Sequence, residues 1–101
     1  MLEISSQEQL ERELNTEFAV VVEFTQARCQ PCKKMGIVLQ AVESEHLDVK
    51  FFVVDVERFP GLAGLYGVQS TPVTAIFRGG KIKEHIIGVK NKDYIKELLA
   101  K

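Results

Sequence analysis

Two long hydrophobic runs predict buried β-strands in the first half of the chain. Residues 18–24 read FAVVVEF and residues 49–56 read VKFFVVDV. Continuous runs of β-branched and aromatic residues are typical of strands covered on both faces. A helix that begins near Pro31 separates them, with its apolar residues at helical spacing: Met35, Val38, Leu39 and Val42. The order strand, helix, strand predicts two parallel strands joined by a right-handed crossover.

The second half of the chain predicts a short helix, a hairpin and a final helix. Residues 59–67 (FPGLAGLYG) place apolar side chains on one helical face, but two internal glycines weaken this helix and keep it short. Gly79-Gly80 separates the apolar segments 73–77 and 81–87, which is typical of a hairpin with a two-residue turn. Residues 91–99 predict the last helix. Its expected core-facing residues are Tyr94, Ile95, Leu98 and Leu99.

The polar N-terminal segment predicts a first helix, and residues 1–4 predict a short edge strand before it. Ser5 and Glu8 have the spacing of a capping pair, and Leu10 and Leu14 follow at helical spacing. The resulting order, (β)αβαβαββα, favours an α/β fold with a mixed sheet and helices on both faces. A length of 101 residues suits one domain, residues 1–101.

Composition and charge narrow the function classes. Thirteen basic and fourteen acidic side chains give a net charge of −1, so nothing favours binding to nucleic acid. The apolar runs are far shorter than the roughly 20 residues needed to cross a bilayer, so we expect no membrane span. The N-terminus lacks the basic start and apolar stretch of a secretory signal, so we expect a cytoplasmic protein. We also expect the protein to be a monomer.

Both cysteines lie in one tetrapeptide, Cys29-Gln30-Pro31-Cys32, between a predicted strand and a predicted helix. Two thiols at this spacing can close a small disulfide ring. At a helix N-terminus, the first sulfur faces free backbone N–H groups and the positive end of the helix dipole, which stabilises the attacking thiolate. The preceding Arg28 adds positive charge. Cys29 is therefore the candidate nucleophile and Cys32 the candidate resolving thiol.

The two cysteines have two other interpretations. Cysteine is often simply buried, but adjacent placement in a polar turn argues against two unrelated core thiols. A structural zinc site needs four ligands, and only His46 and His85 could complete the set. Their spacing matches no zinc-finger pattern. We instead expect His46 to end a helix and His85 to lie exposed on the hairpin.

Three segments of the chain resemble the thioredoxin family in order and spacing. They are VVEFTQARCQPCKK at residues 21–34, VDVERFPGLAGLYGVQSTPVTAIFRGGK at residues 54–81, and the single Gly88 before the last helix. A lone C-x-x-C is a weak signal, but YGVQSTP at its expected distance makes the resemblance specific. The resemblance covers residues 18–100. It implies the thioredoxin fold, a central mixed β-sheet flanked by helices on both faces, and disulfide exchange as the activity.

The resemblance also implies roles for further residues. Pro72, after Thr71, matches the family's cis-proline, which faces the disulfide and presents backbone groups to an extended substrate. Glu23 matches the family's buried acid, which would exchange a proton with Cys32. From the residues alone, two alternatives stay open: Pro72 as a trans proline that opens a strand, and Glu23 as an exposed residue of a half-buried strand. The candidate substrate-binding residues are Arg28, Gln30, Pro31, Thr71, Pro72 and Gly88.

The chain departs from the family pattern around the motif. Arg28 stands where a tryptophan usually precedes the first cysteine, and Gln30 replaces the usual glycine. Thr71 and Glu23 are choices more common among protein disulfide isomerases. Phe51 falls near the position of a lysine that often pairs with the buried acid, which leaves Glu23 without an obvious cation. Because positive charge beside the first thiol favours the thiolate, we expect a more oxidising disulfide than that of an ordinary thioredoxin.

These features predict a thiol–disulfide oxidoreductase that reduces protein disulfides through Cys29 and Cys32. The resemblance implies thioredoxin reductase as the electron donor, and no cofactor or metal bound to this chain. One alternative keeps the chemistry and reverses its direction, as a thioredoxin-fold oxidase or isomerase. A second alternative is a thioredoxin-fold interaction module with little turnover. Both cysteines and the candidate cis-proline argue against it, because a pure scaffold needs none of them.

Overall fold

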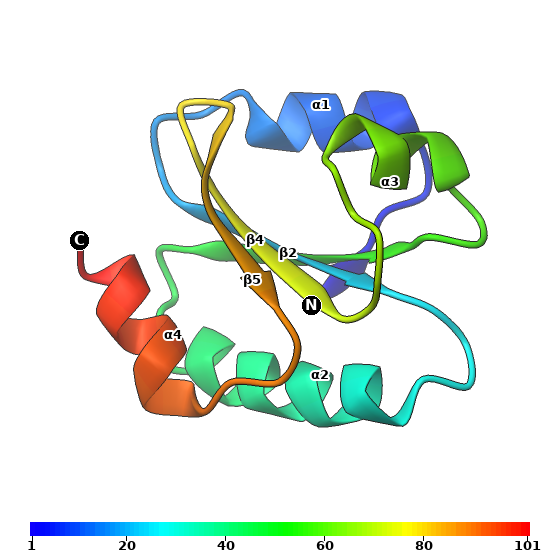
Figure 1. Cartoon of the computed structure of the whole chain (residues 1–101). Helices are drawn as coiled ribbons and strands as arrows, with labels where there is room; N and C mark the ends of the chain where they lie inside the picture. The colour runs from blue at the N-terminus through cyan, green and yellow to red at the C-terminus, as the bar shows by residue number, and fades with distance from the viewer.

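The two continuous apolar runs form the centre of one five-stranded sheet. The computed structural model describes residues 1–101 (Figure 1). The strands are β1 (Leu2–Glu3), β2 (Val20–Thr25), β3 (Lys50–Asp55), β4 (Val73–Arg78) and β5 (Lys81–Ile87). Their order across the sheet is β1-β3-β2-β4-β5. Strands β1, β3 and β2 run parallel, whereas β4 is antiparallel to β2 and to β5, so the predicted mixed sheet is confirmed.

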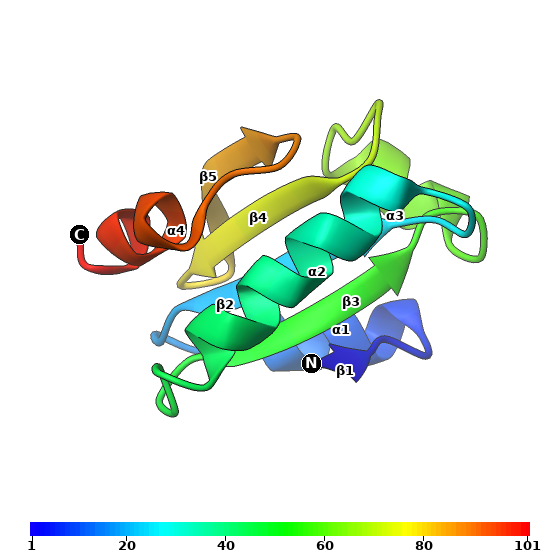
Figure 2. The same cartoon turned by 90° about the horizontal axis from the view of Figure 1, so that it is seen from below.

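Four helices cover the two faces of this sheet. They are α1 (Gln7–Leu14), α2 (Gln30–Glu43), α3 (Pro60–Leu65) and α4 (Lys92–Leu99). Figure 1 shows α1 and α3 above the sheet and α2 and α4 below it, and Figure 2 looks onto the face that α2 crosses. The predicted placement of helices on both faces is confirmed, and α3 is short, as its two glycines predict.

Successive residues of β2 serve two separate hydrophobic cores. Val20, Val22 and Phe24 pack into the core on the α1 and α3 side. Val21 packs into the core on the α2 and α4 side, where Glu23 shares its face of the strand. Burial on both faces explains why β2 reads as a continuous apolar run rather than an alternating one.

Three local predictions are wrong. The N-cap of α1 is Ser6 and not Ser5, because Ser6 Oγ accepts the backbone N–H of Gln9 at 3.0 Å. Phe18 precedes β2 and is 70% exposed, and its backbone N–H donates to the Thr16 hydroxyl rather than to a neighbouring strand. Tyr94 is 44% exposed rather than core-facing. The buried stripe of α4 runs through Ile95 and Leu99, and the next residue on a helix points about 100° away from such a stripe.

The turn of the terminal hairpin and the exposed His85 lie as the sequence predicts, whereas His46 lies beyond the end of α2 at Glu43. Gly79 and Gly80 have φ angles of 61° and 77°, the positive values that a two-residue hairpin turn of this type requires. His46 follows α2, and its Nδ1 lies 3.0 Å from the carbonyl oxygen of Val42. His85 is exposed on β5. No group of three or more His, Cys, Asp or Glu side chains is arranged to hold a metal ion.

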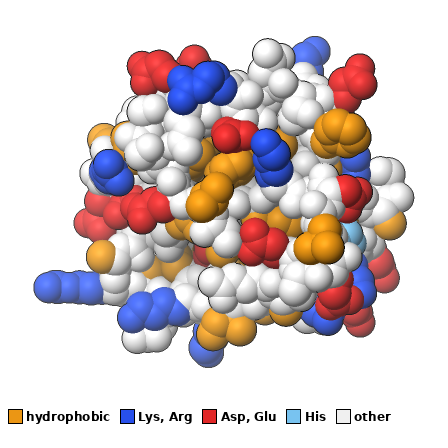
Figure 3. Space-filling view, turned by 180° about the vertical axis from the view of Figure 1, so that it is seen from behind, with side chains coloured by type: hydrophobic (Ala, Val, Ile, Leu, Met, Phe, Trp, Pro, Cys, Tyr) orange, Lys and Arg blue, Asp and Glu red, His pale blue; other side chains and the backbone are white.

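The surface and the helix lengths add two observations. In Figure 3, acidic and basic side chains are interspersed over the visible face rather than gathered by sign. None of the helices combines the length and hydropathy that crossing a lipid bilayer requires.

Candidate active site

The two cysteines form a disulfide at the N-terminus of α2. Cys29 is the N-cap residue, and its Sγ accepts the backbone N–H of Cys32 at 3.2 Å. Pro31 lies in the first turn, where its missing N–H costs no helical hydrogen bond. Cys29 is 8% exposed and Cys32 is 3% exposed. The first sulfur therefore has the N-terminal environment that favours a thiolate, and Cys29 is the more exposed of the two residues.

A distant loop lies against the sulfur of Cys29. The peptide bond between Thr71 and Pro72 is cis, so the alternative of a trans proline is wrong. The carbonyl oxygen of Thr71 lies 3.9 Å from Cys29 Sγ, and the Thr71 hydroxyl donates to the same sulfur at 3.6 Å. Pro72 is buried, and its carbonyl oxygen accepts the backbone N–H of Gly88 at 3.0 Å. The fold thus brings residues 29–32, 71–72 and 88 together, as the resemblance implies.

Glu23 is buried on β2 beneath α2. Its side chain is 2% exposed, so the alternative of an exposed residue is wrong. A Cβ at Gly36 would lie 3.4 Å from Glu23 Oε1, so the absence of a side chain there leaves space for the carboxyl group. Cys32 is four residues before Gly36 and therefore lies on the same face of α2, one turn away. The carboxyl group is thus buried beneath the face of α2 that carries Cys32.

Burial controls the ionisation of Glu23. Desolvation raises the pKa of this carboxyl group from 4.5 to about 7. Its neighbour on β3 is Val53 and not Phe51, and Val53 carries no charge that could oppose the shift. Glu23 Oε2 has no hydrogen-bond partner among the side chains and backbone. A carboxyl group of this kind changes its protonation near neutral pH, which suits proton exchange with a thiol.

Arg28 has an unusual backbone conformation that sequence reasoning missed. It has a φ angle of 61°, the left-handed region that favours glycine, and its side chain is exposed. For an ordinary residue this conformation costs roughly 1–2 kcal/mol. Arginine carries no signal for it, since asparagine, aspartate and glycine are the residues that adopt it readily. The turn directs the chain from β2 into the N-cap at Cys29.

The remaining candidate substrate-binding residues surround the disulfide at the surface. Gln30 and Pro31 are exposed at the start of α2, whereas Thr71 and Gly88 are half-buried. Gly88 has a φ angle of 84°, which explains the glycine at this position.

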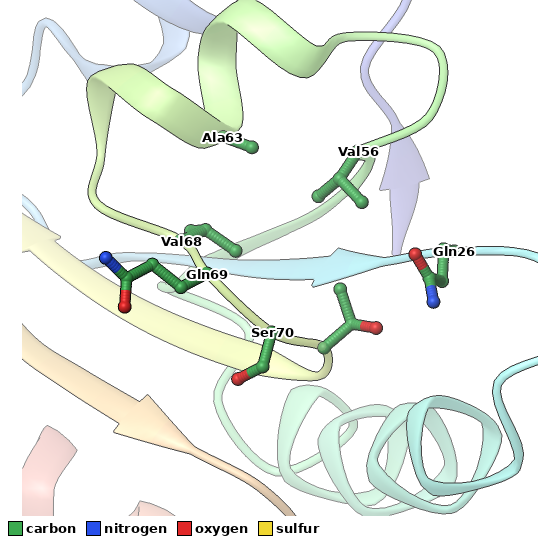
Figure 4. Close-up of a pocket in the computed structure, with 7 residues that line it drawn as sticks. Gln26, Val56, Ala63, Val68, Gln69 and Ser70 are labelled. Carbon is green, nitrogen blue, oxygen red and sulfur yellow. The ribbon is translucent and has the colours of Figure 1, made fainter.

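A pocket of about 200 Å³ adjoins this surface on the side of α3 (Figure 4). Its polar, uncharged lining residues are Gln26, Gln69, Ser70 and Thr71, and its apolar ones are Val56, Ala63 and Val68. The cysteines do not line it, but Thr71 contacts both the pocket and Cys29. The pocket had no signal in the sequence, because its walls come from four separate segments of the chain.

Comparison with known proteins agrees with this geometry. The family model described as Thioredoxin matches residues 2–101. Thioredoxin from Mycoplasmoides gallisepticum is 33% identical over 99 residues, which cover 98% of this chain and 99% of that protein. Thioredoxin from Chlamydia trachomatis is 35% identical over 82 residues, or 81% of this chain and 80% of that protein. Both alignments therefore cover most of this chain and most of the related protein.

The solved structures point to the same fold. The X-ray structure of Fasciola hepatica thioredoxin superposes with a TM-score of 0.90 at 25% identity, covering 99% of this chain and 97% of that one. With the family model, the curated relatives and the Cys29–Cys32 disulfide in agreement, this chain belongs to the thioredoxin family of thiol–disulfide oxidoreductases.

Proposed function

We propose that this chain acts as a monomer that reduces disulfides in other proteins by dithiol–disulfide exchange. The observation that supports this most directly is the contact of Cys29 Sγ with Thr71, next to the cis Pro72. An extended substrate placed along Thr71 would bring its own disulfide to the more exposed sulfur of the pair. Backbone hydrogen bonds would then hold it with little dependence on its sequence.

The reaction has two exchange steps. The Cys29 thiolate attacks one substrate sulfur, forms a mixed disulfide, and releases the other substrate sulfur as a thiolate. The Cys32 thiolate then attacks Cys29 Sγ, which releases the second substrate thiolate and closes the Cys29–Cys32 disulfide. Two electrons pass to the substrate, and its two thiolates take up protons. A flavin-containing thioredoxin reductase that draws on NADPH would return two electrons to the pair, in the reducing cytoplasm.

Glu23 would act in the second step. Cys32 is nearly fully buried and enters the reaction as a protonated thiol, so its attack on Cys29 requires a base. The Glu23 carboxylate would accept that proton within the protein. A pKa of about 7 leaves an appreciable fraction of the group ionised at neutral pH and still able to hold the proton.

The direction of the reaction has a second candidate. Arg28 directly precedes Cys29, and positive charge near a thiolate stabilises the reduced form and makes the disulfide more oxidising. This favours a thioredoxin-fold oxidase or isomerase. A module with little turnover is the third candidate.

Two measurements separate these candidates. Reduction of insulin in the presence of dithiothreitol should be faster with this protein than without it, and absence of any acceleration would favour the interaction module. Equilibration with glutathione buffers gives the redox potential. A value near −270 mV, the range of thioredoxin, supports a reductase, whereas a value near −120 mV supports an oxidase.

A further inference from the structure

Glu23 and Thr74 lie directly opposite each other on neighbouring strands. They are register partners in the antiparallel pairing of β2 and β4, so both side chains point to the face covered by α2. In such pairs the Cβ atoms are about 4.5–5.5 Å apart. Thr74 is fully buried, and Glu23 nearly so. They are the buried polar residues of a layer that is otherwise apolar.

Each of the two side chains holds an oxygen atom without a hydrogen-bond partner. These atoms are Glu23 Oε2 and Thr74 Oγ1, and no other buried side-chain polar atom lacks a partner. Buried polar atoms in folded proteins almost always have one. Two further neighbours of Glu23 offer no partner, since Val53 has an apolar side chain and Gly36 has no side chain at all.

We propose that Thr74 is a positioning residue for Glu23, and that its hydroxyl is the hydrogen-bond partner of the Glu23 carboxyl group. A hydroxyl can donate to the carboxylate and can accept from the carboxylic acid. The two oxygens are not bonded in the present side-chain conformations, so the proposed bond requires rotation about the Thr74 Cα–Cβ bond. The bond would orient the carboxyl group toward the second thiol. This inference rests on the proposed role of Glu23 as the base for Cys32.

The hydrogen bond has a predictable effect on ionisation. A hydrogen bond donated by the hydroxyl stabilises the charged carboxylate and therefore lowers the pKa of Glu23. This effect opposes desolvation, which raises the same pKa. The titratable group on α2 nearest to this layer is Cys32, whereas Lys33 and Lys34 are exposed. Titrating the oxidised protein removes the coupling to Cys32, because a disulfide sulfur does not titrate.

The test compares Thr74→Val with Thr74→Ser in the oxidised, full-length protein. Valine keeps the shape and removes the hydroxyl, whereas serine keeps the hydroxyl. The Glu23 pKa is read from the carboxyl ¹³C shift of glutamate-labelled protein, and Glu23→Gln assigns the signal. We expect Thr74→Val to raise this pKa by roughly half to one pH unit, the size of one hydrogen bond, and Thr74→Ser to leave it near the wild-type value.

A second readout follows the proposed chemistry. Release of a small thiol from its mixed disulfide with Cys29 reports the attack by Cys32, and its pH profile should move upward with Thr74→Val in parallel with the Glu23 pKa. An unchanged or lowered Glu23 pKa in Thr74→Val overturns the inference, as does an equal rise in Thr74→Ser. If Thr74→Val fails to fold, Thr74→Ala replaces it with the same expectations. The titration needs no turnover, so it can succeed or fail independently of insulin reduction.

Discussion

The carbonyl oxygen of Thr71 lies 3.9 Å from Cys29 Sγ, although 42 residues separate them in the chain. Through this contact, the residue before Pro72 faces the sulfur that we assign as the nucleophile. In the reduced protein, the Thr71 hydroxyl could donate to a thiolate at the same place where it now donates to the disulfide sulfur. Cys29 Sγ therefore accepts one hydrogen bond from the loop before β4 and one from the N-terminus of α2.

Separate serine substitutions should distinguish the roles of the two cysteines. Cys29→Ser should abolish attack on substrates, because serine is not a nucleophile toward disulfides at neutral pH. Cys32→Ser should accumulate mixed disulfides with protein substrates, because the first step survives and the second cannot occur. Non-reducing gel electrophoresis with oxidised insulin measures the adducts. If Cys29→Ser accumulates adducts and Cys32→Ser does not, the two roles are reversed.

Replacing Arg28 should change the redox potential by a small amount. Arg28→Gln removes the charge, and Arg28→Lys keeps it, while both retain an ordinary residue at the left-handed position. Since exposed charge interactions are weak, we expect Arg28→Gln to make the potential more negative by less than about 20 mV and Arg28→Lys to leave it unchanged. Glutathione equilibration measures both. A more positive potential in Arg28→Gln would show that the charge does not stabilise the Cys29 thiolate.

Glu23 should make the folded protein less stable as the pH rises. Its pKa is about 7 in the folded state and near 4.5 when unfolded, so the folded state binds the extra proton between these values. Stability therefore falls from about pH 4.5 upward, and the loss is complete above about pH 7. The loss should be on the order of 3 kcal/mol, from about 1.36 kcal/mol for each pH unit between the two pKa values.

Urea unfolding of the oxidised protein at pH 4.5 and pH 8 measures this loss. Glu23→Gln should remove most of it, because the amide has no charged form to desolvate. Glu17→Gln is the matched control, since Glu17 is exposed and should not alter the pH dependence. Equal pH dependence in the wild type and in Glu23→Gln would place the effect elsewhere in the protein.

Filling the pocket beside Thr71 should impair protein substrates selectively. Ala63→Phe would occupy much of the cavity of about 200 Å³ without touching the disulfide. We expect kcat/KM for insulin to fall several-fold and the rate with bis(2-hydroxyethyl) disulfide to remain near the wild-type value. Leu65→Phe is the control on the same helix, because Leu65 is exposed and does not line the pocket. An equal loss for both disulfides would mean that the substitution disturbs the reactive turn itself.

The local pattern of the sequence was enough to predict the elements and the fold class. Each signal that predicted an element spans only a few neighbouring residues, and secondary structure responds to such local preferences. These signals are the apolar runs at 18–24 and 49–56, the helical spacing after Pro31 and the Gly79-Gly80 turn. This local pattern did not determine the boundaries of the helices and strands. Ser5 and Ser6 are equally good caps in sequence, and in the structure Ser6 caps the helix whose Leu10 and Leu14 lie in the core.

The chemical environment of the site was decided by tertiary structure. The order of the predicted elements placed a C-x-x-C at a helix N-terminus, and the resemblance implied that Pro72 would face it. No local signal, however, marked the left-handed Arg28, the pocket beside Thr71 or the pairing of Glu23 with Thr74. The pocket and the pairing depend on segments that are distant in sequence and become neighbours only when the sheet forms. The φ angle of Arg28 is local, but arginine gives no signal for it. A carboxyl group acquires a pKa of about 7 only once β2 has been covered by α2 and by its neighbouring strands, because desolvation is a property of the packed layer and not of the residue.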